Sequence, residues 1–149
     1  KEEYYYGIKL HVLGAHRDKS IPFPEFVGTT KASVHDRTAF TQITSSLSNC
    51  DVFGDKAYAH EEENLKLKLE RNVQVTTPIK LKKGQKKLDS ADNLYSKMVS
   101  KIRQPIESFF NWIQVKTGIQ IASKVRSSRG LIVHTYGRIV TGLMLMLKI

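Results

Sequence analysis

At 149 residues, the chain has the length of one ordinary domain that can bury a core without disulfides. Its 40% hydrophobic and 26% charged residues exclude a disordered segment, and its single cysteine, Cys50, excludes an intramolecular disulfide and a cysteine-based zinc cluster. Lys and Arg number 24 against 14 Asp and Glu, and the formal charge of +10 favours a polyanionic partner such as nucleic acid. We therefore expect one domain over residues 1–149, in the reducing cytoplasm.

The N-terminal region predicts a β-hairpin. Residues 4–13 are rich in aromatic and branched side chains, and from Ile8 they alternate apolar and polar positions as a half-buried strand does. A polar turn at 14–20 leads to a second extended run at 21–29, whose two prolines suit an edge strand. We expect the two runs to pair.

The middle of the chain predicts helices alternating with short strands. An apolar stripe at helical spacing marks a helix that is capped by Ser33 or Asp36 and ends near Ser48. After it we expect a buried strand at 51–54, a surface helix at 61–71 held by Leu65 and Leu69, and an extended segment at 73–79.

The C-terminal region predicts a lysine-rich loop and two helical regions. The first helical region runs to about Lys116, and Pro105 is expected to kink it or to start a fresh helix, because proline lacks the backbone donor. Gly118 ends this region, and an apolar helix follows at 131–147, which is short for a membrane span and predicts a core helix of a soluble protein. The order of elements indicates an α/β domain with helices covering a mixed sheet.

Two carboxylates stand where phosphodiester chemistry would need them. Asp55 follows the predicted buried strand, and Glu107 lies in an apolar helical run 52 residues later. Two divalent metals stabilise the attacking and leaving oxygens of such a reaction, and carboxylate oxygens suit Mg²⁺. On pattern alone, a turn or helix cap remains open for Asp55, and a solvated helix position remains open for Glu107.

Five motifs occur in the order found in bacterial insertion-sequence transposases of the DDE type, and the chain resembles their catalytic domain over almost its whole length. The motifs are YYGIKLH at 5–11, VHD at 34–36, GDKAY at 54–58, RQPIESFF at 103–110 and RGL at 129–131. The resemblance implies an RNase H-like fold, a mixed sheet with helices on both faces. It also implies two Mg²⁺ ions, which Mn²⁺ can replace, and DNA strand cleavage and transfer by an Asp, Asp, Glu set.

By this resemblance, Asp55 matches the second acidic residue of the set and Glu107 matches the third, so both are expected to be catalytic and metal-binding. The first Asp is expected on a strand before the hairpin, and Asp18, in the hairpin turn, is poorly placed to substitute. We therefore expect a fragment that lacks its first strand, does not cleave DNA by itself and can be without metal. The full-length parent is expected to be an enzyme.

The resemblance also includes a helical signature of Tyr, Arg, Glu and Lys, which this chain matches in part. Arg103 and Glu107 match, whereas Ser100 stands at the Tyr position and Gln114 at the Lys position. Arg103 and Gln114 are thus the supporting candidates, with a plain surface role still open for Arg103. Lys116 cannot replace the missing Lys, since nine residues from Glu107 is about two and a half helical turns.

Two basic groups are candidates for binding the DNA backbone without sequence specificity, although a solvated loop remains open for each lysine. They are Lys80, Lys82, Lys83, Lys86 and Lys87 in the first loop, and Lys124, Arg126 and Arg129 in the second. The expected partners are transposon ends, target DNA and a second copy of the full-length protein, with no membrane. Two alternatives remain: an inactive transposase-derived DNA-binding domain, and an RNase H-like nuclease. His35 and Asp36 predict a helix cap or, by resemblance, a position near the active site.

Overall fold

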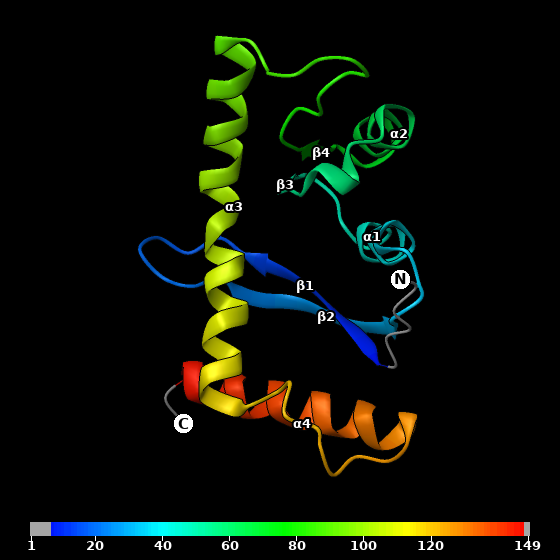
Figure 1. The fold of residues 1–149 in the computed structure, drawn as a ribbon, viewed down its shortest axis with the longest axis vertical. Helices are drawn as coiled ribbons and strands as arrows, with labels where there is room; N and C mark the ends of the chain where they lie inside the picture. Colours follow the sequence, from blue (N-terminus) through cyan, green and yellow to red (C-terminus); the bar gives the residue numbers. More distant parts are fainter. Residues whose placement is uncertain (1–6, 148–149) are drawn as a thin grey trace. The chain divides into compact units, whose positions relative to one another are not determined.

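A computed structural model describes residues 7–147 of the chain, which divide into two compact units. Unit 1 comprises Lys1–Val34 and Ile106–Ile149, and unit 2 comprises His35–Pro105. Each unit combines strands with helices, so the α/β class is confirmed (Figure 1). The described strands form two separate two-stranded sheets, one antiparallel and one parallel, and not the single mixed sheet that was predicted. The aromatic run 4–6, expected at the start of the first strand, lies outside the described residues.

Unit 1 contains the predicted hairpin. Strand β1 (Ile8–Ala15) pairs antiparallel with β2 (Phe23–Lys31). The register shifts between Leu13 and Gly14, which is an irregularity of the bulge type. A Cβ on Gly14 would lie 2.8 Å from the Cβ of Pro22, so the close approach of the two strand ends requires glycine there. The hairpin prediction is confirmed.

The core of unit 1 lies between the hairpin and two helices, α3 (Ser90–Thr117) and α4 (Ser128–Leu147). Phe109 and Ile113 of α3 and Ile139 of α4 are almost fully buried, and hairpin residues pack against them. Gly142 allows α4 to approach α3, because a Cβ there would lie 3.2 Å from the Cδ1 of Ile113. Gly118, with φ of +62°, ends α3 as predicted.

The predicted fresh helix start at Pro105 is wrong, because α3 continues through this residue as one helix. The proline removes only one intrahelical hydrogen bond, the one to the carbonyl of Lys101. Both flanks are anchored by buried side chains, Val99 in unit 2 and Phe109 in unit 1. Tertiary packing on each side therefore outweighs the local cost of the proline.

Helix α4 differs in two ways from its prediction. It begins at Ser128, so Arg129 lies in its first turn and not in a loop. Only one face is buried, and the exposed fraction reaches 68% at Val133, so the expectation of a core helix is only partly correct. By length and composition α4 could also cross a membrane, a test that core helices of soluble proteins pass as well, and 17% of its apolar window is buried.

Unit 2 contains helix α1 (Asp36–Thr44) and a strand-helix-strand segment. The segment consists of β3 (Cys50–Phe53), the 3-10 helix η1 (Lys56–Tyr58), α2 (Glu61–Arg71) and β4 (Val73–Thr76). Strands β3 and β4 pair in parallel, and the N–H of Gly54 extends the ladder by donating to the carbonyl of Thr76 at 2.9 Å. The buried core of this unit includes Ile43, Val73 and Val75.

Two predictions about unit 2 are wrong in detail. The strand at 51–54 is not buried on both faces, because Val52 is buried while Phe53 is 37% exposed. Leu65 and Leu69 do not hold α2 against the unit, since 56% and 76% of these residues are exposed; Leu67 is the half-buried leucine instead. The three leucines alternate along the sequence, and their spacing alone does not decide which helix face is inward.

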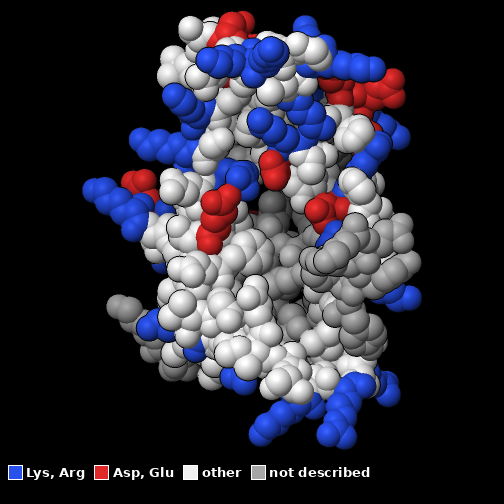
Figure 2. All heavy atoms as spheres, in the orientation of Figure 1, with Lys and Arg blue, Asp and Glu red and all other residues white. Residues whose placement is uncertain are grey.

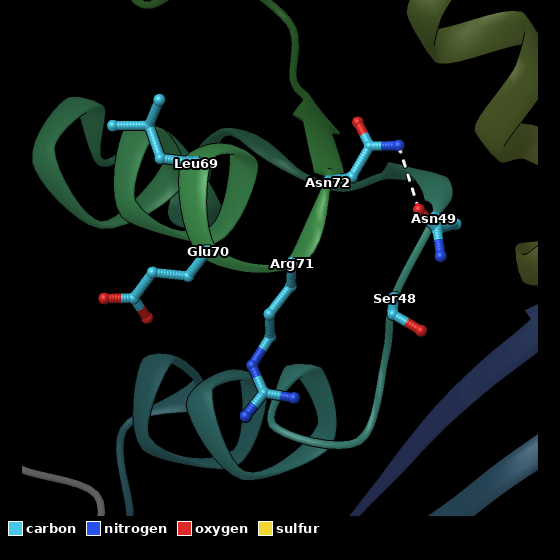
Figure 3. A pocket seen from close by; sticks show the side chains of 6 residues that line it. All are labelled: Ser48, Asn49, Leu69, Glu70, Arg71 and Asn72. Carbon is cyan, nitrogen blue, oxygen red and sulfur yellow. Dashed lines mark hydrogen bonds between the residues drawn. The ribbon is translucent and has the colours of Figure 1, made fainter.

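An asparagine pair closes the amino ends of the parallel strands. Asn49 precedes β3 and Asn72 precedes β4; both have φ of 53°, the left-handed region that asparagine tolerates. The side-chain amide of Asn72 donates to Oδ1 of Asn49 at 3.0 Å, and both line a shallow pocket (Figure 3). This pocket therefore lies at the amino ends of β3 and β4, whereas Asp55 follows the carboxyl end of β3.

Candidate functional site

Asp55 lies just beyond the carboxyl end of β3, where it begins η1. Its Oδ1 accepts a hydrogen bond from the N–H of Lys56, and its backbone carbonyl accepts one from the N–H of Tyr58 at 3.0 Å. Asp55 therefore has the helix-cap role that the sequence allowed as an alternative to metal binding. The side chain is also exposed, so capping does not remove the carboxylate from ligands in solution.

Tyr58 packs against the end of β3 that leads to Asp55. Its ring stacks in a tilted arrangement on that of Phe40 of α1, with centroids 4.7 Å apart. A Cβ on Gly54 would lie 3.0 Å from Cδ2 of Tyr58, so the ring covers the residue immediately before Asp55. The side-chain amide of Asn64 in α2 donates to the Tyr58 carbonyl at 3.0 Å.

Charged groups surround Tyr58 within unit 2. Burial raises the pKa of its phenol, the negative charges of Asp36 and Asp55 raise this pKa further, and the positive charge of Arg103 lowers it. Asp55 and Arg103, both predicted site residues, are therefore within electrostatic reach of the same side chain. Asp36 joins them, and its place in the VHD motif was the sequence signal for this position.

His35 and Asp36 also show how α1 begins. Nδ1 of His35 accepts a hydrogen bond from the N–H of Arg37 at 3.2 Å, which makes His35 the N-cap. The helix-cap prediction for this pair is confirmed for His35, whereas the prediction that Ser33 or Asp36 caps the helix is wrong, because Asp36 is the first helical residue and Ser33 lies outside the helix. Asp36 occupies the first turn, where a negative charge is favourable next to the helix dipole.

Glu107 lies in unit 1, whereas Asp55 and Arg103 lie in unit 2. It occupies an exposed position of α3 next to half-buried Ile106. Gln114, at the Lys position of the helical signature, has a local role: its Oε1 accepts a hydrogen bond from the N–H of Gln120 at 2.9 Å. Gln114 therefore stabilises the turn that follows α3.

The basic candidates are all exposed. The lysine loop turns at Gly84, whose φ is +86°, and a hydrogen bond from the N–H of Ile79 to Oγ of Ser96, at 3.1 Å, anchors its root on α3. Figure 2 shows basic side chains gathered over this end of unit 2, with acidic ones among them. Lys124 and Arg126 lie between α3 and α4, in unit 1.

The chemistry of Asp55 fits a divalent metal, because an exposed carboxylate offers the hard oxygen that Mg²⁺ prefers. A complete ligand set is a different matter. Within residues 7–147, no group of three or more His, Cys, Asp or Glu side chains comes together in a way that could hold a metal ion. Asp55 by itself offers one carboxylate, which is fewer than the ligands that a bound Mg²⁺ takes.

A family model described as "Transposase DDE domain" matches residues 1–139. The chain belongs to this family. Comparison with curated proteins and comparison with solved structures gave no match. The predicted resemblance to DDE transposases is thus confirmed.

Membership of the transposase DDE domain family indicates a transposase, an enzyme class that acts on DNA and generally uses a divalent metal. The matched range contains both candidate carboxylates and both basic groups, and it ends at Ile139 within α4. The family match therefore extends over parts of both units.

Proposed function

We propose that this chain is part of an RNase H-like catalytic domain of a DDE transposase and that Asp55 and Glu107 bind the catalytic metal ions in the full-length protein. In this proposal residues 1–149 belong to one catalytic domain of a longer parent protein. The parent protein cleaves transposon ends and transfers them to target DNA. Arg103 supports the site, and two copies of the full-length protein pair the two ends. The parent protein is bacterial and acts in the cytoplasm.

The family match over residues 1–139 is the observation that carries this proposal. The position of Asp55 supports it, because ligands of open α/β sheets bind outside the carboxyl ends of parallel strands, and Asp55 follows that end of β3. Its exposure leaves the carboxylate accessible to a metal and to DNA.

Each part of the chain has a defined task in this proposal. Bound Mg²⁺ ions supply stabilisation of the negative charge that develops on the attacking and leaving oxygens. Asp55 provides a carboxylate ligand that its cap and Tyr58 hold in place, and Glu107 provides a second one. The lysine loop and the Lys124 to Arg129 segment bind DNA phosphates, which gives affinity and register without reading the sequence.

A second candidate function is DNA binding by a domain whose active site has decayed. The observation that favours it concerns the helical signature: Ser100 hydrogen-bonds through its Oγ to the carbonyl of Ser96, at 2.8 Å, and Gln114 stabilises the turn after α3. Both side chains thus make local contacts at the two signature positions that differ from the family pattern.

Metal binding by Asp55 tests the proposed function. The measurement is Mn²⁺ affinity of the full-length protein by electron paramagnetic resonance, with Asp55→Asn compared against Asp51→Asn, an exposed aspartate of β3, the strand that precedes Asp55. We expect the Asp55 variant to lose Mn²⁺ binding and the Asp51 variant to keep it. Equal binding by the two variants would contradict the proposed metal role.

Strand cleavage tests the catalytic part of the proposal. The 149-residue chain is expected to leave a supercoiled plasmid intact with Mn²⁺, since only two members of the acidic set are assigned in it. The full-length protein is expected to nick the plasmid and to lose this activity on Asp55→Ala or Glu107→Gln, with Glu25→Gln, an exposed glutamate of β2, as control. Nicking by the 149-residue chain that is abolished by Asp55→Ala would refute the fragment prediction. Full activity of the Glu107→Gln protein would refute the role of Glu107.

A further inference from the structure

We propose that Tyr58 is a positioning residue that fixes the carboxylate of Asp55. This inference rests on the proposed metal role of Asp55 and adds the means by which the strand end is held. It does not depend on the phenol hydroxyl, because the contacts that hold the ring are made by its carbon atoms.

The first contact lies directly before Asp55. Gly54 is buried, and its N–H is bonded to the carbonyl of Thr76 on β4, so its backbone is held on the sheet side. The Tyr58 ring covers its Cα so closely that a Cβ would lie 3.0 Å from Cδ2. Gly54 is therefore held between β4 and the ring, and Asp55 leaves the strand in one direction.

The second and third contacts hold Tyr58 itself. Phe40 of α1 stacks on the ring at 4.7 Å, and Asn64 of α2 binds the Tyr58 carbonyl at 3.0 Å. Tyr58 thus connects the candidate ligand to the helices that precede and follow it in sequence. Since the N–H of Tyr58 donates to the carbonyl of Asp55, any movement of Tyr58 changes the backbone of the ligand directly.

A side chain that is held in this way is pre-organised for a metal. Residues that orient metal ligands typically change metal affinity by about 10-fold to 100-fold when they are replaced. We therefore expect Tyr58→Leu to weaken Mn²⁺ binding at Asp55 by about 10-fold. Tyr58→Phe should retain the affinity of the unchanged chain, because it keeps the ring.

The first test needs no metal and measures the Asp55 cap. Hydrogen exchange of the Lys56 amide, which donates to Asp55 Oδ1, is followed by nuclear magnetic resonance in folded protein. We expect faster exchange in Tyr58→Leu, unchanged exchange in Tyr58→Phe, and unchanged exchange in Tyr95→Leu, a half-exposed tyrosine of the same unit. Unchanged exchange in Tyr58→Leu overturns the inference.

A second variant reaches the same ring from the other side and keeps the test decisive if Tyr58→Leu fails to fold. Gly54→Ala places a methyl group against the ring while leaving Tyr58 itself intact. We expect it to accelerate Lys56 amide exchange as Tyr58→Leu does. Exchange equal to that of the unchanged chain in a folded Gly54→Ala protein overturns the inference.

The second test is Mn²⁺ affinity of the full-length protein with the same substitutions. An affinity that falls in Tyr58→Leu and is restored in Tyr58→Phe supports positioning of the ligand, whereas equal affinities in all three proteins overturn it. If the full-length protein binds no Mn²⁺ at Asp55, the proposed function fails, and the exchange rates alone decide whether Tyr58 fixes this carboxylate.

Discussion

Arg37 of α1 forms a two-point ion pair with Glu63 of α2. Nε of Arg37 donates to Oε2 of Glu63 at 3.0 Å, and its Nη2 donates to Oε1. The planar guanidinium matches the carboxylate geometry, which makes this the strongest type of surface pair. It joins the helices on either side of the segment 50–58 in sequence, and it therefore stabilises the part of unit 2 that carries Asp55.

This pair predicts an acid-sensitive contribution to stability. The hydrogen bond from Arg37 lowers the pKa of Glu63 below its ordinary value of 4.5. A carboxylate with a lowered pKa in the folded state stabilises that state above its ordinary pKa, and the contribution disappears as the pH falls through the lowered value. We expect Glu63→Gln to reduce the free energy of unfolding at pH 7 and to reduce it less at pH 3, because the carboxylate is more protonated there.

Urea denaturation at the two pH values measures this effect. Glu62→Gln, which changes the neighbouring exposed glutamate, is the matched control and should show little difference between the two pH values. A loss of stability in Glu63→Gln that is the same at pH 7 and pH 3 would contradict a pH-dependent contribution of the ion pair to the free energy of unfolding.

The lysine loop predicts the salt dependence of DNA binding. Each phosphate that a protein neutralises contributes about 0.9 to the slope of log affinity against log salt on duplex DNA. Changing the five loop lysines to glutamine is therefore expected to reduce the slope by about 0.9 for each phosphate that the loop no longer binds. Binding of the 149-residue chain to a random duplex, measured by fluorescence anisotropy across a salt series, gives the slopes.

Two exposed lysines of unit 1, Lys19 and Lys31, provide the control for the loop. Their change to glutamine lowers the net charge without touching the loop, so it should alter the slope less for each charge removed. Equal changes per charge in the two proteins would mean that overall charge, and not the loop, determines binding.

The left-handed backbone at Asn72 predicts a graded response to substitution. An alanine side chain in this conformation costs about 1–2 kcal/mol, whereas glycine adopts it freely. We expect Asn72→Ala to lower the free energy of unfolding by about 1–2 kcal/mol, and Asn72→Gly to lower it by a smaller amount. Urea titration decides, with the exposed Asn93→Ala as control; equal reductions in both Asn72 variants would contradict the backbone argument.

The core of unit 1 predicts a contrast between two adjacent phenylalanines. Phe109 is 2% exposed and Phe110 is 37% exposed, and their rings meet edge to face. Replacing a buried phenylalanine by alanine typically costs about 3–5 kcal/mol. We expect Phe109→Ala to approach this reduction in unfolding free energy and Phe110→Ala to cause a clearly smaller one. Similar reductions in the two variants would contradict the assignment of Phe109, and not Phe110, to the buried core of unit 1.

Much of the local structure could be predicted from the sequence because it depends on local rules. The alternating run from Ile8 predicted β1, and the helix at 61–71 has the predicted bounds. Gly118 ends α3 as its freedom at positive φ predicts. The failures concern packing: the inward face of α2, the buried fraction of α4 and the continuity of α3 through Pro105 depend on contacts with distant parts of the chain.

The candidate site was predictable only in part. The motif around Asp55 indicated a strand end, and the structure places the residue there. The central place of Tyr58 could not be inferred, because its contacts with Phe40 and Asn64 link positions that no periodicity relates. The metal roles of Asp55 and Glu107 remain predictions that rest on the family.

Pro105 has a consequence for hydrogen exchange of the amides along α3. The boundary between the two units falls directly after this residue. Because proline has no N–H, the helical hydrogen bond from residue 105 to the carbonyl of Lys101 is missing. Amide exchange in native proteins follows cooperative opening of separate regions. The two halves of α3, although one helix, should therefore exchange their amides with two different protection levels, and each half should follow the opening of the unit in which it is packed.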